Sequence, residues 1–172
     1  CRCGGGGGGG GDDDARHEPV YIQYKRMKEA HERRRVQVGR SAIHGWGAFV
    51  TEAVRADEML LEYTGELIRQ KIADERERRY DAAGIGTYMF RIGDDEIIDA
   101  TKKGSAARFC NHSCAPNCYT RMHDISGTKV IVIHARHALA AGTELTYDYN
   151  FDFEDDKLVC TCGAPTCRGY LN

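Results

Sequence analysis

Three cysteines in a short C-terminal stretch constrain the fold of this chain more than any other feature: Cys160, Cys162 and Cys167. The tail around them is polar and has little apolar surface to pack. Their spacing offers three thiolates to a structural zinc ion, which needs a fourth ligand from elsewhere. Cys110, Cys114 and Cys118 compete for that place, and each is equally suited to be a small buried hydrophobe. Metal binding would supply the free energy that orders so short a tail.

Length and composition narrow the classes of protein to which the chain can belong. Its 172 residues make one domain that is long enough to bury a core. The formal net charge of the chain is −2, so the molecule as a whole is not a polycation of the kind that binds nucleic acid. The eight cysteines are clustered, which favours metal binding in a reducing compartment over a secreted disulfide framework. No apolar run approaches the roughly 18 residues of a membrane span, so we expect no membrane contact.

Glycine and charge divide the chain into segments. The glycine run from Gly4 to Gly11 cannot pack, and it predicts that residues 1–19 are a disordered, low-complexity segment. Residues 20–39 form a basic flanking segment, and an acidic stretch follows Asp148. Each charge run is either a solvated face or a surface for a partner of opposite charge, such as a basic peptide at the acidic stretch. We assign no role to Cys1 and Cys3.

Short apolar segments, interrupted by glycine and polar residues, predict a mainly β protein with short helices. Helical spacing favours two helices, from Tyr24 to Arg35 and from Ile68 to Tyr80, the second with Ile68 and Ile72 on one face. Ser126-Gly127 predicts a hairpin turn. Because strands do not alternate with long helices, a doubly wound parallel sheet is excluded. Strands are expected at Ala48–Val50, Met59–Tyr63, Tyr88–Ile92, Glu96–Asp99, Cys118–Arg121, Lys129–His134 and Glu144–Tyr147.

Three polar motifs are candidates for a binding or catalytic site. Asn111-His112 lies in an apolar segment, where buried polar side chains need defined partners that a ligand could supply. The turn from His44 to Gly47 contains two glycines, which let the backbone approach a ligand, although a plain loop has the same pattern. Tyr147 and Tyr149 alternate at strand spacing, either for packing or to line a narrow channel. Four further tyrosines could add to such a channel: Tyr63, Tyr80, Tyr88 and Tyr119.

The order of these motifs resembles a SET-domain protein lysine methyltransferase over nearly all of residues 40–172. Within that family the chain most resembles the trithorax and mixed-lineage-leukaemia group, the catalytic subunits of COMPASS-type complexes. The resemblance implies a SET fold at residues 40–150, with small β-sheets, a pseudoknot and an inserted helix, and a post-SET zinc segment at residues 151–172. The shared motifs are His44-Gly-Trp-Gly47, Gly84-Ile-Gly-Thr-Tyr88-Met-Phe90, Arg108-Phe-Cys-Asn111-His112-Ser-Cys114, Glu144-Leu-Thr-Tyr147-Asp-Tyr149 and the terminal cysteines.

The resemblance also implies roles for individual residues. One structural zinc ion is expected on Cys114, Cys160, Cys162 and Cys167. Catalysis is expected at Tyr149, Tyr147 and Tyr88. The cofactor S-adenosylmethionine is expected against His44, Gly45, Trp46, Tyr88, Arg108, Phe109, Asn111, His112 and Thr161.

The implied reaction is methyl transfer from S-adenosylmethionine to a lysine side chain, above all lysine 4 of histone H3. Because tyrosine, with a pKa of about 10, is a poor base at neutral pH, we expect Tyr149 to align the lysine amine and not to deprotonate it. The resemblance places Tyr147 at the Phe/Tyr switch position of the family, where a hydroxyl restricts the room for added methyl groups. It thereby implies an enzyme that is monomethyl-biased when alone. The implied partners are the histone H3 tail and COMPASS-type adaptor subunits of the WD-repeat and SPRY types, with indirect contact to chromatin in the nucleus.

Three alternatives stay open on the sequence alone. The substrate could be a lysine of another protein, or the chain could be an inactive SET scaffold that binds partners. The presence of both tyrosines and of Asn111-His112 argues against the scaffold. A zinc-dependent nucleic-acid module would account for the cysteines but would leave those polar groups without a role.

Overall fold

The computed structural model describes residues 18–32, 35–151 and 155–172. The glycine run, Cys1 and Cys3 lie outside these residues, so the expected disorder of residues 1–17 stays a prediction. Glu18 and Pro19, at the end of that expected segment, are described, and the Glu18 carboxylate lies 3.0 Å from Arg26 Nη1. The described elements are, in chain order, α1 (Val20–Glu32), β1 (Val36–Arg40), β2 (Trp46–Val50), β3 (Met59–Tyr63), β4 (Glu66–Ile68), α2 (Gln70–Ala82), β5 (Met89–Gly93), β6 (Glu96–Asp99), the 3-10 helix η2 (Ala106–Phe109), β7 (Asn111–His112), β8 (Cys118–Ile125), β9 (Thr128–Ala135) and β10 (Thr146–Tyr147).

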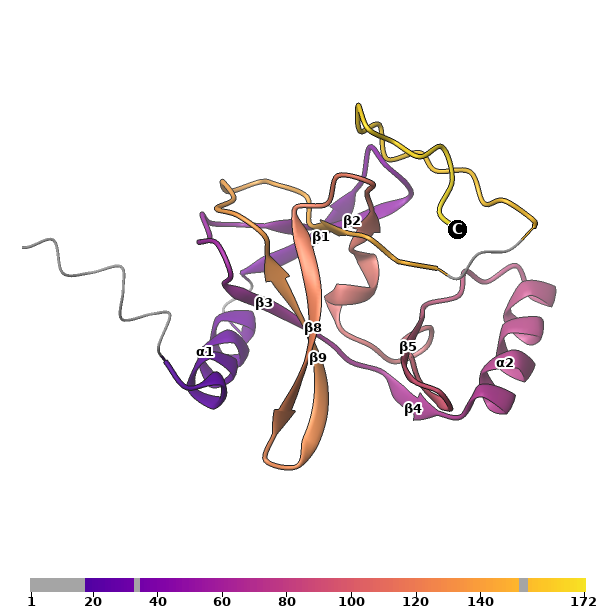
Figure 1. The fold of residues 1–172 in the computed structure, drawn as a ribbon, viewed down its shortest axis with the longest axis horizontal. Coiled ribbons are helices and arrows are strands. Elements are labelled where there is room, and N and C mark those ends of the chain that lie inside the picture. Colours follow the sequence, from indigo (N-terminus) through magenta and orange to yellow (C-terminus); the bar gives the residue numbers. More distant parts are fainter. Residues whose placement is uncertain (1–17, 33–34, 152–154) are drawn as a thin grey trace, which may run out of the picture.

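The strands of the described residues form small separate sheets, as expected for a mainly β chain. One sheet has the order β3-β9-β8 and another the order β4-β6-β5, while β1 pairs with β2 and β10 pairs with β7. Figure 1 shows the long β8–β9 hairpin between α1 on one side and α2 with β4 and β5 on the other. The C-terminal segment, drawn in yellow, runs past β2 on the side of the molecule that also carries α2.

The main core surrounds β9, the central strand of its sheet. Every residue from Val130 to Ala135 is buried, which is typical of a strand covered on both faces. Leu61 of β3 and Leu145, just before β10, are fully buried in the same cluster of apolar side chains. This core holds β3 and the segment that leads to β10 in fixed positions.

Helix α1 packs against the β3-β9-β8 sheet. Met27 is buried with Met59, Val130 and Val132 in a second apolar cluster. The Tyr24 hydroxyl and the Lys28 ammonium each lie 2.8 Å from the same carboxylate oxygen of Glu62 on β3. The N-terminal flanking segment is therefore attached to the domain by apolar and polar contacts.

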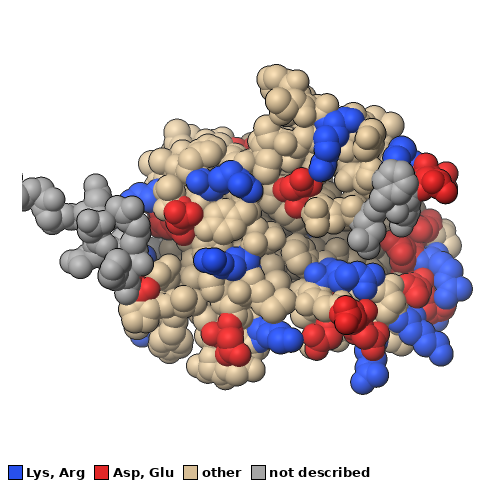
Figure 2. All heavy atoms as spheres, viewed as in Figure 1, with Lys and Arg blue, Asp and Glu red and all other residues tan. Residues whose placement is uncertain are grey.

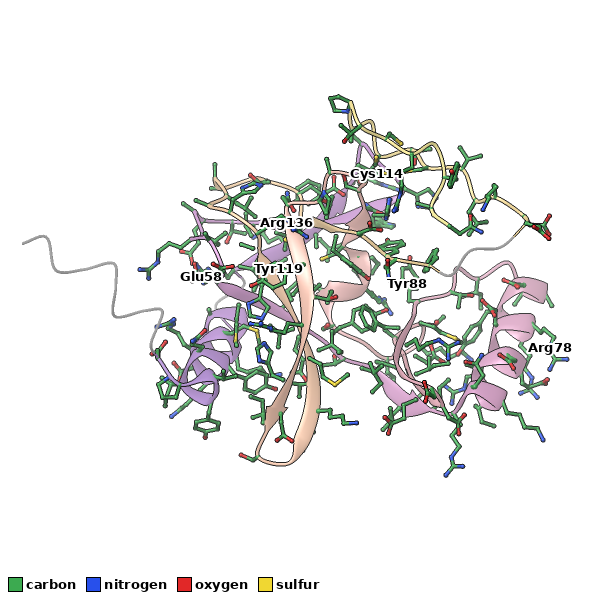
Figure 3. All side chains as sticks on the ribbon, in the orientation of Figure 1. Glu58, Arg78, Tyr88, Cys114, Tyr119 and Arg136 are labelled. Carbon is green, nitrogen blue, oxygen red and sulfur yellow. The ribbon has the colours of Figure 1, made fainter. Side chains whose placement is uncertain are left out.

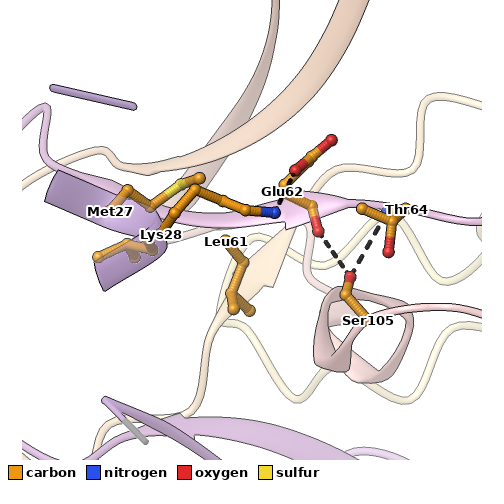
Figure 4. A pocket seen from close by; sticks show the side chains of 7 residues that line it. Met27, Lys28, Leu61, Glu62, Thr64 and Ser105 are labelled. Atoms are coloured by element: carbon orange, nitrogen blue, oxygen red, sulfur yellow. Dashed lines mark hydrogen bonds and ion pairs between the residues drawn. The ribbon is translucent and has the colours of Figure 1, made fainter. Parts of the chain in front are cut away.

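A cavity of about 220 Å³ lies where α1 meets β3 (Figure 4). The Lys28–Glu62 ion pair lies at its wall, and the Ser105 hydroxyl donates a 2.6 Å hydrogen bond to the Glu62 carbonyl oxygen. None of the polar motifs singled out from the sequence contributes to its lining, which consists of Met27, Lys28, Leu60, Leu61, Glu62, Thr64 and Ser105.

Helix α2 starts later than predicted, and it buries a different face from the predicted one. It begins at Gln70, and Ile68 is the last residue of β4. Ile72 is 48 % exposed, whereas Ala73 and Tyr80 are buried. The expected apolar face was wrong because Ile68 does not belong to the helix. Neither α1 nor α2, each 13 residues long, has the length and apolarity needed to cross a membrane.

Most strand predictions are confirmed. Met59–Tyr63 and Glu96–Asp99 agree with β3 and β6. The expected strand Glu144–Tyr147 is shortened to the two residues of β10, and the other expected strands shift or extend by a few residues. The hairpin turn is confirmed, since Ser126 and Gly127 have φ angles of 54° and 83° between β8 and β9. Strands β1, β4 and β7 were not predicted, because they contain few consecutive apolar residues.

Candidate functional site

The Asn-His and tyrosine motifs lie side by side on the short parallel pair β7–β10. Thr146 lies opposite Asn111, and Tyr147 lies opposite His112. All four residues are buried. The Ser113 amide extends the pairing with a 3.2 Å hydrogen bond to the Tyr147 carbonyl oxygen. The fold thus brings together two motifs that are far apart in the sequence.

Asn111 ties β7 to the glycine turn that starts at His44. Its Nδ2 lies 2.7 Å from a carboxylate oxygen of Glu144 and 3.0 Å from the Ser41 hydroxyl and the Trp46 carbonyl oxygen. The Ser41 hydroxyl donates to the same Glu144 oxygen at 2.7 Å. The protein itself thus supplies acceptors for the two hydrogens of Asn111 Nδ2, and a contact of Asn111 with a ligand stays a prediction.

The glycine turn offers backbone to the site and side chains to solvent. Gly45 has a φ of 47°, and a Cβ at Gly47 would overlap the Glu144 carboxylate. The His44 side chain is exposed, and Trp46 is 46 % exposed with the Arg40 guanidinium 4.3 Å from its ring. The backbone of this turn thus faces the site, while contacts of the His44 and Trp46 side chains with a ligand stay predictions.

The His112 imidazole has a protein partner at each ring nitrogen. Nδ1 accepts a 3.2 Å hydrogen bond from the Tyr149 amide, and Nε2 lies 3.3 Å from Cys114 Sγ. Burial lowers the pKa of His112 below its ordinary value; Asp148 opposes this shift and Arg168 adds to it. A buried ring with a lowered pKa stays neutral at physiological pH.

An aromatic cluster surrounds the two tyrosines. The ring centroids of Tyr147 and Tyr149 are 5.0 Å apart, Phe90 lies 6.4 Å from Tyr147, and Tyr63 lies 5.1 Å from Phe90. Burial raises the pKa of Tyr147 well above its ordinary value, with Tyr63 and Tyr149 adding to the rise. Burial likewise raises the pKa of Tyr149, and the neighbouring Cys110 contributes. Both phenols stay protonated at neutral pH, so neither can act there as a general base.

Tyr88, Arg108 and Phe109 form a second group beside this cluster. Arg108 Nη1 donates to the carbonyl oxygens of Ala100 and Thr101, at 2.9 and 3.1 Å. The guanidinium lies 4.6 Å from the Phe109 ring and 5.6 Å from the Tyr88 ring. The Tyr88 and Phe109 rings meet edge to face at 5.9 Å, and Figure 3 places Tyr88 between the domain body and the α2 side.

The cysteine cluster forms as expected, with Cys114 as its fourth member. The four sulfur atoms lie within 4.8 Å of one another: Cys114, Cys160, Cys162 and Cys167. Cys114 Sγ is 3.9 Å from Cys160 Sγ and from Cys167 Sγ. A tetrahedral zinc site with Zn–S bonds of about 2.3 Å has S–S edges of about 3.8 Å, so the donor set fits that ion. The S–S separations are far longer than the roughly 2.05 Å of a disulfide.

The other two competing cysteines belong to the core. Cys110 and Cys118 are fully buried away from the terminal cysteines. Burial raises the pKa of Cys118 to about 12 and that of Cys110 well above its ordinary value. Protonated thiols in apolar surroundings behave as small hydrophobes and not as metal ligands.

The side chains of Thr161 and Arg168 help to attach the C-terminal segment to the domain. The Thr161 hydroxyl donates a 3.0 Å hydrogen bond to the Ile43 carbonyl oxygen, immediately before the glycine turn. Arg168 Nη2 lies 3.0 Å from the Asp148 carboxylate, between the two tyrosines in sequence. Figure 3 shows Cys114 directly beside this segment. Asp148 is thus paired within the chain, and Asp152 and Glu154 of the acidic stretch lie outside the described residues.

Two of the tyrosines proposed for a channel lie elsewhere. Tyr80 donates to Asp99 beneath α2, and Tyr119 stacks on His134 at 5.1 Å. Further residues contribute to the site but were not predicted from the sequence, namely Phe90, Ser41, Glu144, Asp148 and Arg168. Phe90 and Glu144 stood in motifs that were identified, but their contacts come from tertiary packing, which spacing in the sequence does not reveal.

Comparison with known proteins gives independent evidence on the family. The family model described as SET domain matches residues 45–150. The chain is 52% identical over 154 residues to histone-lysine N-methyltransferase trithorax of Drosophila virilis, a match that covers 90% of this chain. It is 54% identical over 138 residues, 80% of this chain, to histone-lysine N-methyltransferase set-2 of Caenorhabditis elegans.

A fungal relative is equally similar. Histone-lysine N-methyltransferase, H3 lysine-4 specific, of Schizosaccharomyces pombe is 53% identical over 141 residues, which is 81% of this chain. These matches span only 4%, 9% and 15% of the lengths of the three relatives, so the chain corresponds to a small part of each. From the match to its model and the similarity to these relatives, the chain belongs to the SET-domain family.

Proposed function

We propose that this chain is the catalytic module of a protein lysine methyltransferase that uses S-adenosylmethionine and acts on lysine 4 of histone H3. The observation that carries the proposal is the parallel β7–β10 pair, which sets Asn111-His112 beside Tyr147 and Tyr149. The names of the relatives support the reaction, and the name of the fungal relative supports the position of the lysine.

The cofactor would lie against the residues around the glycine turn and β7. The backbone from His44 to Trp46, the Asn111-His112 strand and Thr161 converge there through the hydrogen bonds that Asn111 and Thr161 make. Beside this region lie the Tyr88 and Phe109 rings, which meet edge to face, and the Arg108 guanidinium over the Phe109 ring. When bound, the cofactor supplies an electrophilic methyl group on a cationic sulfonium.

The lysine side chain would enter the aromatic cluster of Tyr63, Phe90, Tyr147 and Tyr149. Such a wall attracts the cationic amine through its ring faces before the proton is lost. The nucleophile must be the neutral amine, and lysine has an ordinary pKa of about 10.4, so a proton must leave before attack. Both phenols remain protonated, and their part is to orient the amine. Alignment of this kind can contribute up to about 7–11 kcal/mol.

The four-cysteine cluster would hold one structural zinc ion. Zinc on Cys114, Cys160, Cys162 and Cys167 would hold the C-terminal segment close to β7. Thr161 of the same segment bonds to Ile43, immediately before the glycine turn. Elemental analysis of the purified protein should give one zinc per chain, and substitution of Cys162 by serine should lower that content.

The proposed partners are the histone H3 tail and adaptor subunits of the WD-repeat and SPRY types, acting on chromatin in the nucleus. A nucleic-acid module is less consistent with the surface, because Figure 2 shows basic and acidic side chains interspersed on the face that it displays. We further propose that the chain alone is biased toward monomethylation, since Tyr147 keeps its hydroxyl in the aromatic cluster.

The proposal is tested by mass spectrometry of an H3 tail peptide incubated with the protein and S-adenosylmethionine, with and without adaptor subunits. A matched peptide in which arginine replaces the target lysine serves as the control. We expect methylation of the first peptide alone. Methylation of both peptides would indicate another lysine, and methylation of neither under any condition would favour an inactive scaffold.

A further inference from the structure

The buried His112 side chain contacts both the four-cysteine cluster and the segment that carries Tyr149. On one side its ring meets Cys114, a member of the four-cysteine cluster, and on the other it meets the backbone of Tyr149. His112 is only 4% exposed, so water does not compete for these two contacts. No other described side chain is recorded in contact with both the sulfur of Cys114 and the Tyr149 backbone.

The geometry selects one tautomer of the ring. The Tyr149 amide always carries its hydrogen, and its 3.2 Å hydrogen bond requires Nδ1 of His112 to be the acceptor. In a neutral imidazole the other nitrogen then carries the hydrogen. Nε2–H therefore donates to Cys114 Sγ over 3.3 Å. The Asp148 carboxylate lies farther from Nδ1, at 3.5 Å, and its Oδ1 already accepts from Arg168 and from the Asn150 amide.

Donors to the cluster have a clear physical role. Four thiolates around one divalent cation carry an excess of two negative charges, and N–H donors reduce that excess. The Arg168 amide donates to Cys114 Sγ at 3.4 Å, and the Gly169 amide donates to Cys167 Sγ at 3.3 Å. These two donors belong to the C-terminal segment itself. His112 gives the cluster a side-chain donor from the body of the domain, so it couples the cluster to β7.

We propose that His112 is a positioning residue that links the metal-binding sulfur of Cys114 to the backbone of Tyr149. The ring holds the Tyr149 amide at a fixed distance from the cluster, so an ordered cluster keeps the Tyr149 hydroxyl in place. The part that concerns Tyr149 rests on the proposed methyl transfer, whereas the part that concerns the sulfur does not. The Arg168–Asp148 ion pair connects the same two segments from the outside.

Two substitutions separate the two contacts. His112→Asn retains an oxygen acceptor near the position of Nδ1 but has no donor that reaches Cys114. His112→Gln retains an N–H donor near the position of Nε2 but has no acceptor for the Tyr149 amide. His137→Asn is the matched control, because His137 is exposed and lies away from the cluster.

The first measurement uses protein loaded with Co²⁺ and does not depend on activity. We expect the sulfur-to-cobalt charge-transfer bands to shift to lower energy in His112→Asn and to stay unchanged in His112→Gln and in the control. Release of the metal to a chelator should be several-fold faster in His112→Asn alone. An unchanged spectrum in His112→Asn would overturn the contact to the sulfur.

The second measurement is steady-state methyl transfer. We expect His112→Gln to lower kcat roughly tenfold, the equivalent of about 1.4 kcal/mol, with KM for the peptide within twofold. His112→Asn should retain more of kcat than His112→Gln. Equal losses in the two variants would reduce His112 to a packing residue. If the unsubstituted protein transfers no methyl group, the proposed function fails while the cobalt result still stands.

A third measurement needs no variant. In ¹⁵N spectra of the zinc-loaded protein, Nε2 of His112 should have the shift of a protonated ring nitrogen and Nδ1 that of an unprotonated one. With ¹¹³Cd in place of zinc, the Nε2 proton should couple to the metal through the sulfur. The opposite tautomer would overturn the proposal even if both variants failed to fold.

Discussion

The hydroxyl of Tyr149 donates a 3.0 Å hydrogen bond to the carbonyl oxygen of Cys110, the residue that caps η2. This contact uses the single hydrogen of the phenol, so the oxygen has only lone pairs left to offer. A lysine amine that approached it would donate an N–H to that oxygen and would keep its own lone pair free for the methyl group. The geometry therefore suits alignment of the amine and does not suit proton abstraction.

Loss of this hydroxyl gives the first prediction. We expect Tyr149→Phe to lower kcat by about a hundredfold, because the amine loses its acceptor and the ring loses its tie to Cys110. The midpoint of thermal unfolding should fall only slightly, since a single hydrogen bond contributes about 1 kcal/mol. Single-turnover transfer to the H3 peptide is the measurement, and Tyr21→Phe, at an exposed tyrosine on α1, is the control. A kcat within threefold of the original would exclude this role for Tyr149.

The second prediction concerns the number of methyl groups transferred. The Tyr147 ring packs between Tyr149 and Phe90, so its hydroxyl lies within the aromatic cluster. We expect Tyr147→Phe to shift the products of the isolated chain from monomethyl toward dimethyl and trimethyl lysine, since removing the hydroxyl makes room. Intact-mass analysis of the peptide over time measures the distribution. An unchanged distribution at equal turnover would show that Tyr147 does not limit methyl addition.

The sequence predicted those parts of the fold that depend on local patterns. Strand β9 was recognisable because a strand buried on both faces is almost continuously apolar. The turn at Ser126-Gly127 was recognisable because two positive φ angles favour such residues. Strand β4 was missed because it is three residues long and half-exposed, and its Ile68 was assigned to the following helix. Short edge strands depend on their partners, and these cannot be read from spacing.

The site was predictable in its residues but not in its contacts. Spacing and resemblance identified Asn111, His112, Tyr147 and Cys114, and the fold brings them together. Their partners come from long-range packing: a pair such as Asn111 and Glu144 has no signature in the sequence. For that reason the protein acceptors of Asn111 Nδ2 were not predicted from the sequence.

The third prediction is a loss of stability in mild acid through a histidine pair. His123 Nε2 lies 2.9 Å from His134 Nε2, and His134 Nδ1 donates to the Asp57 carbonyl oxygen at 3.1 Å. The Tyr119 ring stacks on His134, and Arg121 adds positive charge nearby. Burial is the main cause that lowers the pKa of both histidines, and a proton on His134 Nε2 would also set two donors face to face.

The folded chain should lose stability in acid because folding lowers the pKa of both histidines. Histidine in the unfolded chain has a pKa of about 6.5. Near and below that pH the unfolded chain therefore binds more protons than the folded chain, which favours unfolding. The free energy of unfolding should therefore fall as the pH drops from about 7 to 5, by up to about 1.4 kcal/mol per pH unit for each histidine. His112 contributes in the same direction. The pKa values of Glu58 and Asp99 are lowered below those of ordinary carboxyl groups, so their contribution is lost at still lower pH.

The contribution of the His123–His134 pair to acid sensitivity can be measured with one variant. His123→Gln keeps an N–H donor for His134 and removes one titrating group, so the slope of stability against pH between 7 and 5 should become shallower. Urea unfolding at a series of pH values gives the slope. His137→Gln, at an exposed position, should leave it unchanged. Equal slopes for His123→Gln and the original chain would exclude the pair as a source of acid sensitivity.

The fourth prediction concerns the ion pair that fixes α2 to the β4-β6-β5 sheet. Arg76 Nη1 lies 2.7 Å from the carboxylate of Asp99 and 2.8 Å from that of Glu66. The Asp99 side chain is 1% exposed, and Tyr80 donates to the same Asp99 oxygen at 3.0 Å. Arg76→Met would leave a buried carboxylate without its cation, and breaking such a pair costs about 3–5 kcal/mol. Because Arg76 is itself 28% exposed, we expect the low end of that range, about 3 kcal/mol.

The same helix offers the control for this prediction. Arg79 pairs with Glu75 one turn away, but its side chain is 73% exposed, so Arg79→Met should cost less than about 1 kcal/mol. Chemical unfolding of both variants measures the difference. Adding Asp99→Asn to Arg76→Met should restore part of the loss, because the unpaired charge is removed while the hydrogen bond from Tyr80 remains possible. If the two arginine variants were equally stable, α2 would be held by the packing of Ala73 and Tyr80 and not by the charge of Arg76.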